Sequence, residues 1–253
     1  MTGAPLAARA VGARWPDEYV AGRFLCHADF PLASHRPLLD SLPQLERDLY
    51  GMLGIPPSPE PIHVFLFEKE STYRAYLKQY FPEVPRRKAI FIKGDGPGMV
   101  FAYRGRDFEV DVRHECTHAL LNAALPMVPL WLDEGLAEYF EVPRERRQHG
   151  NPHLGFVKWS ARLGQVPDLK SLEDVSDLKQ MTRSRYRQAW AWVHFMLHGP
   201  PEAREELVRY LADIRALVPP GRLSQRLGRR IADLNQAFAD HFKRWKASTL
   251  LPL

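Results

Sequence analysis

The spacing of apolar and polar positions divides the chain into a front half that mixes strands with helices and a back half that is almost wholly helical. Short apolar runs predict strands over residues 22–27, Ile62–Phe67, Ala89–Ile92 and 99–103. The run Ile62–Phe67 is almost continuously apolar, so we expect this strand near the centre of a sheet. The glycine-rich segment 94–98 joins the last two runs and predicts a hairpin between them.

Apolar residues three and four positions apart predict the helices. A row of leucines indicates a helix over residues 33–53 that ends at Gly54, and Ser71 is placed to cap a helix that runs to about Tyr80. Further helices are predicted over residues 107–124, Leu130–Phe140, 186–197, 202–216 and 231–245.

This order of elements predicts an α+β fold. We expect an N-terminal arm over residues 1–18, followed by a single domain over residues 19–253. Within that domain, a small α/β lobe with a mixed sheet covers residues 19–125, and a mostly α-helical lobe covers residues 126–253.

Composition is that of an ordinary soluble globular protein. Of the 253 residues, 45% are hydrophobic and 26% are charged, and no apolar run approaches the ~18 residues of a membrane span. Two cysteines, Cys26 and Cys116, are too few for a disulfide framework, so we expect two free thiols. The start of the chain has no secretory signal, which favours a cytoplasmic location, with export as the alternative if the leader is missing.

The formal net charge of +5 raises the question of an acidic partner or a nucleic acid. The basic residues occur in short, scattered groups that are not interleaved with aromatic residues, as binding to a single strand would require. Nucleic-acid binding is therefore not expected as the main function, and the sequence leaves the oligomeric state open.

The segment with the clearest chemical content is His114-Glu115-Cys116-Thr117-His118. Residues four apart lie on one face of a helix, so His114 and His118 can direct two imidazoles at one metal ion. Zn²⁺ binds neutral imidazole and, in catalytic sites, three protein ligands with one open position. Glu115 lies beside the first ligand and is within reach of a water at such a site, as a general base must be.

A second helix provides a candidate for the third ligand. Glu134 follows His118 by sixteen residues, and Glu138 lies four residues further on, so both can share one helix face. Pro126 and Pro129 force a turn between the two helices, which allows the second helix to return toward the first.

The HExxH motif followed by Trp131-Leu132-Asp133-Glu134-Gly135-Leu136-Ala137-Glu138-Tyr139 resembles the gluzincin zinc metallopeptidases, most closely the bacterial peptidase MA-like group related to the M1 aminopeptidases. The resemblance implies a zincin-like active-site helix with His114, His118 and Glu134 as zinc ligands and Glu115 as catalytic base. It further implies that an extended peptide lies along an edge strand, for which residues 99–103 are the candidate.

Two further roles follow from the same resemblance. Glu138 has the offset of an acid that orients a zinc-bound histidine through its other ring nitrogen, with a solvated helix residue as the alternative. Tyr186, 52 residues after Glu134, is the candidate catalytic donor to the oxyanion, and Arg187 and His194 are reserve candidates.

Several other histidines and one cysteine could also bind a metal ion, but they have simpler structural interpretations. His194 and His198 are also four apart but lie among aromatic residues and leucine, which favours structural packing. Cys116 is interpreted as a small buried helix residue, and His149 and His153 as surface residues of a polar loop.

Together these patterns predict a zinc metallopeptidase that uses zinc-activated water to hydrolyse peptides or proteins. A catalytically inactive zinc-binding scaffold of the same fold, and a zinc hydrolase of a non-peptide amide, remain the alternatives. The side chains of the substrate, and internal or terminal cleavage, stay open.

Overall fold

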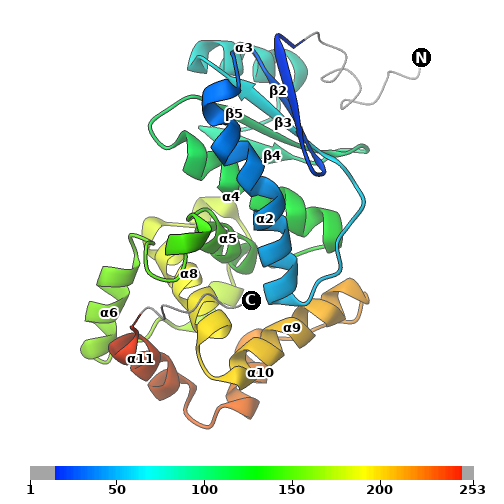
Figure 1. Ribbon diagram of the computed structural model, residues 1–253. Helices are drawn as coiled ribbons and strands as arrows, with labels where there is room; N and C mark the ends of the chain where they lie inside the picture. Colours follow the sequence, from blue (N-terminus) through cyan, green and yellow to red (C-terminus); the bar gives the residue numbers. More distant parts are fainter. Residues whose placement is uncertain (1–14, 247–253) are drawn as a thin grey trace. The chain divides into compact units, whose positions relative to one another are not determined.

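The computed structural model describes residues 15–246, and it divides into two compact units (Figure 1). Of the described residues, the first unit comprises 15–48 and 57–123, and the second comprises 49–56 and 124–246. Residues 1–14 of the predicted arm lie outside the described residues, while residues 17 and 18 belong to the first strand. The single domain over residues 19–253, with lobes that meet at residue 125, stays a prediction.

In the described part of the first unit, five strands form one mixed sheet. They are β1 (Asp17–Ala21), β2 (Phe24–Ala28), β3 (Ile62–Phe67), β4 (Ala89–Ile92) and β5 (Gly98–Tyr103). Their order is β1-β2-β3-β5-β4, with antiparallel pairs at both ends and parallel pairing of β3 with β2 and β5. The central position of β3 and the β4–β5 hairpin are confirmed, and all six residues of β3 are buried.

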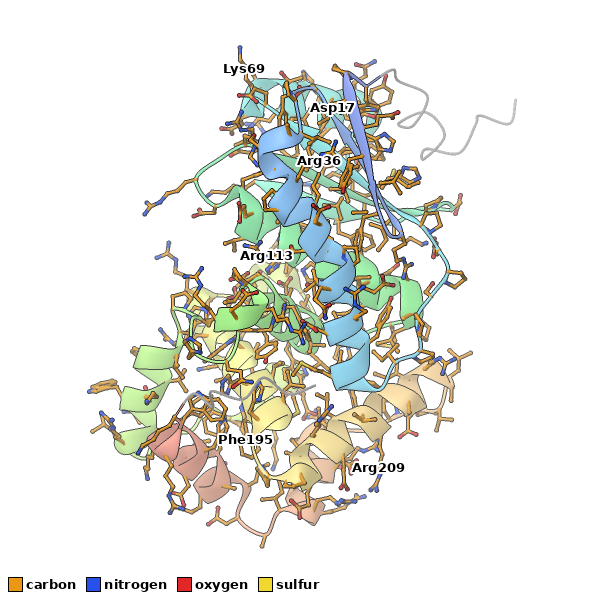
Figure 2. The ribbon with its side chains drawn as sticks, viewed as in Figure 1. Asp17, Arg36, Lys69, Arg113, Phe195 and Arg209 are labelled. Atoms are coloured by element: carbon orange, nitrogen blue, oxygen red, sulfur yellow. The ribbon has the colours of Figure 1, made fainter. Side chains whose placement is uncertain are left out.

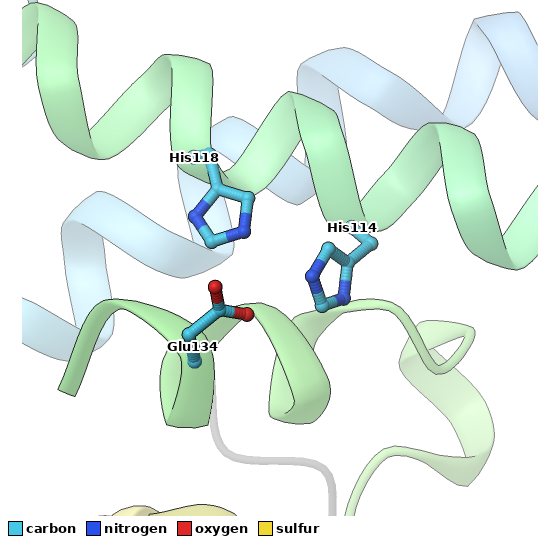
Figure 3. A group of neighbouring side chains, drawn as sticks. All are labelled: His114, His118 and Glu134. Atoms are coloured by element: carbon cyan, nitrogen blue, oxygen red, sulfur yellow. The ribbon is translucent and has the colours of Figure 1, made fainter. Parts of the chain in front are cut away.

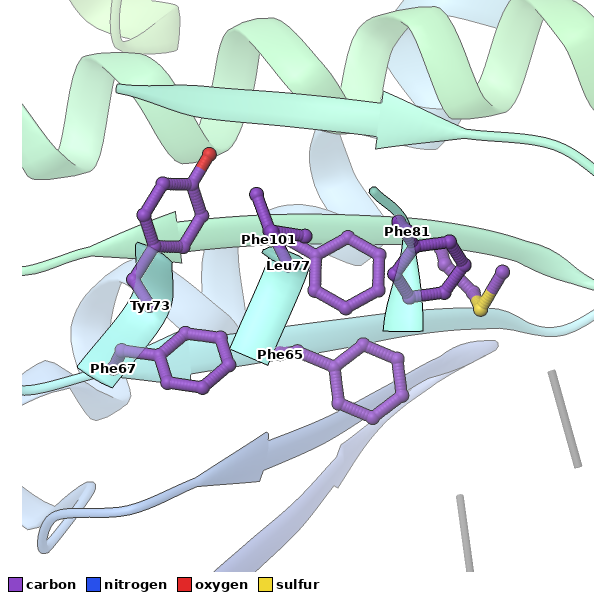
Figure 4. Packing of buried hydrophobic residues seen from close by; sticks show 7 residues of the cluster. Phe65, Phe67, Tyr73, Leu77, Phe81 and Phe101 are labelled. Atoms are coloured by element: carbon purple, nitrogen blue, oxygen red, sulfur yellow. The ribbon is translucent and has the colours of Figure 1, made fainter. Parts of the chain in front are cut away.

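One face of the sheet carries an aromatic core under α3 (Glu70–Tyr80). Alternate residues of a strand point to opposite faces, so Phe65 and Phe67 share this side of β3. Tyr73 and Leu77, one turn apart on α3, pack against them (Figure 4). The buried members of the cluster are Phe65, Phe67, Tyr73, Leu77, Phe81, Met99 and Phe101.

Two more helices belong to this unit in whole or in part, α2 (Arg36–Leu53) and α4 (Phe108–Ala124). The guanidinium of Arg36, at the start of α2, lies 3.6 Å from the ring centre of Tyr19 on β1 (Figure 2). Cys26 on β2 lies close enough to Cys116 on α4 for its charge to help raise the pKa of the Cys116 thiol, so this helix lies near the strand. Both thiols are free and buried, as predicted.

Three local predictions for this unit need correction. Strand β1 was not predicted, because its alternating sequence Asp-Glu-Tyr-Val-Ala has few apolar residues. Ser71 does not cap α3: the N-cap is Lys69, and the helix already includes Glu70. Strand β5 is not an edge strand, because it lies between β3 and β4; among the described strands the two edges are β1 and β4.

The second unit is helical. Its helices are α5 (Leu130–Phe140), α6 (Leu154–Arg162), α7 (Leu169–Glu173), α8 (Arg183–His198), α9 (Pro201–Arg215), α10 (Leu223–Arg230) and α11 (Leu234–Arg244), with 3-10 turns at Arg144–Arg146 and Leu178–Gln180; a further 3-10 turn, Ala33–His35, precedes α2. Helix α8 is central, since its residues from Ala189 to Leu197 are all buried. The ring centres of Trp192 and of Phe238 on α11 lie 4.5 Å apart, with the two planes tilted by 45°, and Phe238 also contacts Phe195.

The fold is therefore α+β, with a mixed sheet in one unit and helices in the other, as the sequence predicts. Helices α6, α7 and α10 were not predicted, because they are short, with nine, five and eight residues. Among the described helices, none combines the length and the apolarity that crossing a bilayer requires.

Candidate metal centre

Helix α4 carries the His-Glu-x-x-His segment in its middle. The carboxylates of Glu109 and Asp111 lie in its first turn, where they interact favourably with the positive end of the helix dipole. After the motif, Ala119, Leu120 and Leu121 are buried. His114 and His118 are both partly exposed, and their ring centres are 4.8 Å apart. The helix therefore presents two imidazoles on one face, as the spacing predicts.

Glu134 belongs to α5, where its position depends on the glycine that follows it. A Cβ atom added to Gly135 would lie 2.8 Å from the backbone oxygen of Ala189 on α8. Only glycine permits this close approach of the two helices, because any side chain would meet backbone atoms that cannot move aside. Glu134 itself is buried, with 4% of its surface exposed.

The ligand atoms of His114, His118 and Glu134 all lie within 4.8 Å of one another (Figure 3). Two imidazoles and one carboxylate form a donor set that suits zinc, and three protein ligands leave a coordination position for water or substrate. This group of residues could therefore hold a metal ion.

Glu115 is buried, with 9% of its surface exposed, and is anchored to the sheet. Its Oε2 atom accepts a hydrogen bond of 2.7 Å from the backbone N–H of Phe91 on β4. Sequence analysis did not identify this contact, because a backbone N–H leaves no signature in the sequence. Its consequence is that one carboxylate oxygen of Glu115 has a fixed partner beside the two histidines.

The neighbours of Glu115 show how burial affects charge around α4. Burial raises the pKa of Asp111, one turn before the motif, while the charges of Lys88 and His114 oppose the shift. Burial also raises the pKa of the Cys116 thiol well above its usual range. Because only the thiolate binds zinc well, Cys116 fits its interpretation as a buried helix residue and not a ligand.

Glu138, one turn after Glu134, pairs with a histidine that sequence analysis placed on the surface. Its Oε2 atom lies 3.2 Å from Nε2 of His153, and the side chain of Asn151 donates a 2.9 Å hydrogen bond to the backbone oxygen of Glu138. Of the two loop histidines, His149 is exposed, whereas His153 is partly exposed and has a carboxylate partner that the sequence did not reveal. That Glu138 orients a zinc ligand stays a prediction.

The oxyanion-donor candidates lie on α8. Tyr186 is half-buried and one turn before Ala189, the residue that Gly135 of α5 contacts. The guanidinium of Arg187 lies 3.7 Å from the ring centre of Phe156. His194 is fully buried, and its Nε2 and Nδ1 atoms contact the Gln148 backbone oxygen and His241 at 3.1 and 3.0 Å. This burial and bonding remove His194 from the reserve candidates.

His194 is the buried member of a histidine cluster that it forms with His198 and His241, which are partly exposed. The hydroxyl of Tyr139 lies 2.6 Å from Nε2 of His198. The ring of Trp245 packs against the rings of all three histidines. Burial is the main cause that lowers the pKa of His198 to about 3 and that of His241 to about 4, and it also lowers the pKa of His194. The interpretation as core packing is confirmed for His194, whereas His198 is partly exposed.

Comparison with known proteins matches part of the chain to one protein family and also finds similar solved structures. Residues 110–220 match a family described as "Protein of unknown function (DUF1570)", a range that includes the three clustered residues. No curated protein sequence matches the chain.

One of the similar solved structures is a crystal structure of a mutant of an M1 zinc metallopeptidase from Deinococcus radiodurans. The two chains are 16% identical with a TM-score of 0.47, and the match covers 95% of this chain and 53% of the other. This chain therefore spans about half the length of that protein.

Proposed function

We propose that the chain is a zinc-dependent peptidase in which Glu115 is the general base for the attack of water on a peptide bond. The observation that carries this proposal is the gathering of His114, His118 and Glu134 within 4.8 Å, with a buried carboxylate next to the first of them. A structural zinc site needs no such acid, because its ligands alone complete the coordination.

In the proposed hydrolysis, each residue of the site has a separate role. When bound, zinc supplies Lewis acidity, which polarises a carbonyl oxygen and makes water a better nucleophile near neutral pH. Glu115 accepts a proton from the attacking water and then delivers it to the amine nitrogen that leaves. The N–H of Phe91 holds Oε2, so Oε1 is the oxygen that is left to carry the proton. Tyr186 is proposed to donate a hydrogen bond to the substrate carbonyl oxygen.

The substrate is proposed to be a peptide that pairs with β4. Among the described strands, β4 is hydrogen-bonded to β5 alone, and the Phe91 N–H that reaches Glu115 is turned away from β5. Along a strand, the N–H and C=O groups of successive residues point alternately to one side and the other. The N–H and C=O of Ala89, two residues before Phe91, therefore also point away from β5. A peptide strand added to this edge would pass beside the Glu115 carboxylate.

The test combines zinc content with cleavage of a mixed peptide library. Wild type, Glu115→Gln and the control Glu109→Gln, an exposed residue of the same helix, are analysed for zinc by elemental analysis. We expect about one zinc per chain in all three, with cleavage by wild type and by the control only.

The other outcomes each contradict a different part of the proposal. Zinc in all three proteins with cleavage by none supports the inactive scaffold. Hydrolysis of small amides without cleavage of peptides supports a different amide hydrolase, and the absence of zinc in every protein rejects the metal site.

A further inference from the structure

A cavity of about 390 Å³ in the first unit lies between α3 and the segment that leads into β4. Its apolar wall is built from buried residues of the aromatic core, Tyr73, Leu77 and Phe81. The charged residues that line it are Arg74, Lys78, Arg86 and Arg87, and no carboxylate is among its lining residues. An apolar wall with a cationic opening suits an anionic group on a short apolar stem.

Most of this positive charge is not neutralised within the described residues. Arg74 forms an ion pair with Glu70 one turn away on α3. Across residues 15–246, no ion pair involves Lys78, Arg86 or Arg87, and Lys78 and Arg86 are exposed to solvent. The cavity therefore has about three cations that remain for a ligand.

Tyr73 links this cavity to the proposed catalytic base. Its hydroxyl donates a 3.1 Å hydrogen bond to the backbone oxygen of Arg87, which closes one side of the cavity. The charge of Glu115 adds to the burial that raises the pKa of Tyr73, so the ring lies within electrostatic range of that carboxylate. The cavity and Glu115 thus share one residue as a neighbour.

The separation between Arg87 and Phe91 along the chain determines which substrate residue would reach the cavity. Arg87 precedes Phe91 by four residues, and strand β4 starts at Ala89 between them. At a rise of about 3.3 Å per residue, these four residues span about 13 Å. A peptide paired with β4 would therefore bring a side chain to the cavity three or four residues away from the bond beside Glu115.

We propose that this cavity is a specificity subsite for an aspartate or glutamate side chain of an extended peptide, three or four residues from the cleaved bond. The inference rests on the proposed peptidase function and adds the class of substrate. The carboxylate meets Lys78, Arg86 and Arg87, and its methylene stem lies on the apolar wall.

The first test measures binding without cleavage. A fluorescein-labelled extended peptide with two adjacent glutamates is titrated into zinc-loaded Glu115→Gln protein at low ionic strength, beside peptides with glutamine or lysine at those positions. We expect the glutamate peptide to bind about five- to tenfold more tightly than the glutamine peptide, because a few part-exposed ion pairs each contribute modestly.

Charge-reversed variants locate the effect. The triple variant Lys78→Glu, Arg86→Glu, Arg87→Glu should lose the preference for glutamate and bind the lysine peptide more tightly. The matched control Arg162→Glu, Arg215→Glu, Arg229→Glu changes the net charge equally at exposed positions of the second unit and should keep the preference. Circular dichroism and melting temperature check that both variants fold.

The outcomes separate this inference from the proposed function. Equal binding of the glutamate and glutamine peptides, or equal loss in both triple variants, overturns the subsite. If wild type cleaves the peptide library with no acidic preference, the subsite is rejected while the peptidase remains. If no peptide is cleaved but the glutamate preference depends on the three cations, peptidase function fails and recognition of acidic peptides stands.

Discussion

The backbone N–H of Phe91 donates a 2.7 Å hydrogen bond to Oε2 of Glu115, which joins the edge strand of the sheet to the carboxylate proposed as general base. The same strand begins two residues after Arg87, a residue of the basic cavity. Strand β4 therefore connects the two features that the proposals assign to catalysis and to substrate choice.

Replacing Phe91 by proline tests whether this bond positions the base. Proline has no N–H, and an edge strand tolerates it where that N–H points away from the sheet. We expect Phe91→Pro to keep its zinc but lose about 10- to 100-fold in kcat, whereas Phe91→Ala, which keeps the N–H, loses less. Equal kcat for the two variants, measured by steady-state cleavage, would show that the hydrogen bond does not orient Glu115.

Adding one methyl group at Gly135 tests the close approach of α5 to α8. The new Cβ atom would lie 2.8 Å from the Ala189 backbone oxygen, so we expect Gly135→Ala to destabilise the protein by about 1–3 kcal/mol. Because Glu134 precedes this position, zinc affinity should fall as well. Gly51→Ala is the control: nothing lies within 4 Å of its Cβ position, and helix propensity predicts a gain of up to about 1 kcal/mol. Urea unfolding and zinc titration measure both effects.

Tyr186→Phe tests the proposed oxyanion donor. Removing one such donor costs about 10²–10³ in kcat, whereas zinc content and KM should stay close to wild type. Tyr210→Phe on α9 is a matched control and should leave kcat unchanged. If Tyr186→Phe retains full kcat, another group stabilises the oxyanion, and Arg187 becomes the next residue to test.

The cluster of His194, His198 and His241 predicts a loss of stability in acid. The pKa is about 3 for His198 and about 4 for His241 in the folded protein, both below the ~6.5 of an unfolded chain. Below about pH 6.5 the unfolded chain therefore binds protons that the folded protein does not, so stability falls as pH falls toward the folded values. Each such group contributes a slope of about 1.4 kcal/mol per pH unit.

His241→Gln isolates one of these slopes. Between pH 5.5 and 4.5 its free energy of unfolding should fall less steeply than that of wild type, by about 1.4 kcal/mol per pH unit. His149→Gln, at an exposed loop position, should follow the wild-type slope. Identical slopes for wild type and His241→Gln in urea unfolding would mean that His241 is not held neutral by the fold.

Local patterns were sufficient for much of the fold and for the residues of the candidate site. Helix α5 and strands β3 and β4 have the boundaries that their sequences predict, because apolar periodicity depends only on near neighbours in the chain. The pairing of His114 with His118 has the same origin, since one helical turn brings residues four apart together. The motif likewise singled out Glu134, which has ligand atoms within 4.8 Å of both histidines.

Other features depend on segments that are distant in the sequence. Strand order made β4 the edge in place of β5, and this order follows from the packing of the whole sheet, which no single strand encodes. Glu138 lies on a helix and His153 in a later loop, so their contact depends on how the loop folds back. The spacing of the two residues in the sequence therefore could not predict it.

By itself, the sequence therefore determined the periodic elements and the type and order of the metal-binding side chains, because both arise within one or two turns of chain. Tertiary structure alone decided which strand edge is open, which backbone N–H meets Glu115, and which cations surround the cavity beside Tyr73. These depend on where separate segments meet, and that is set by the packing of many side chains at once.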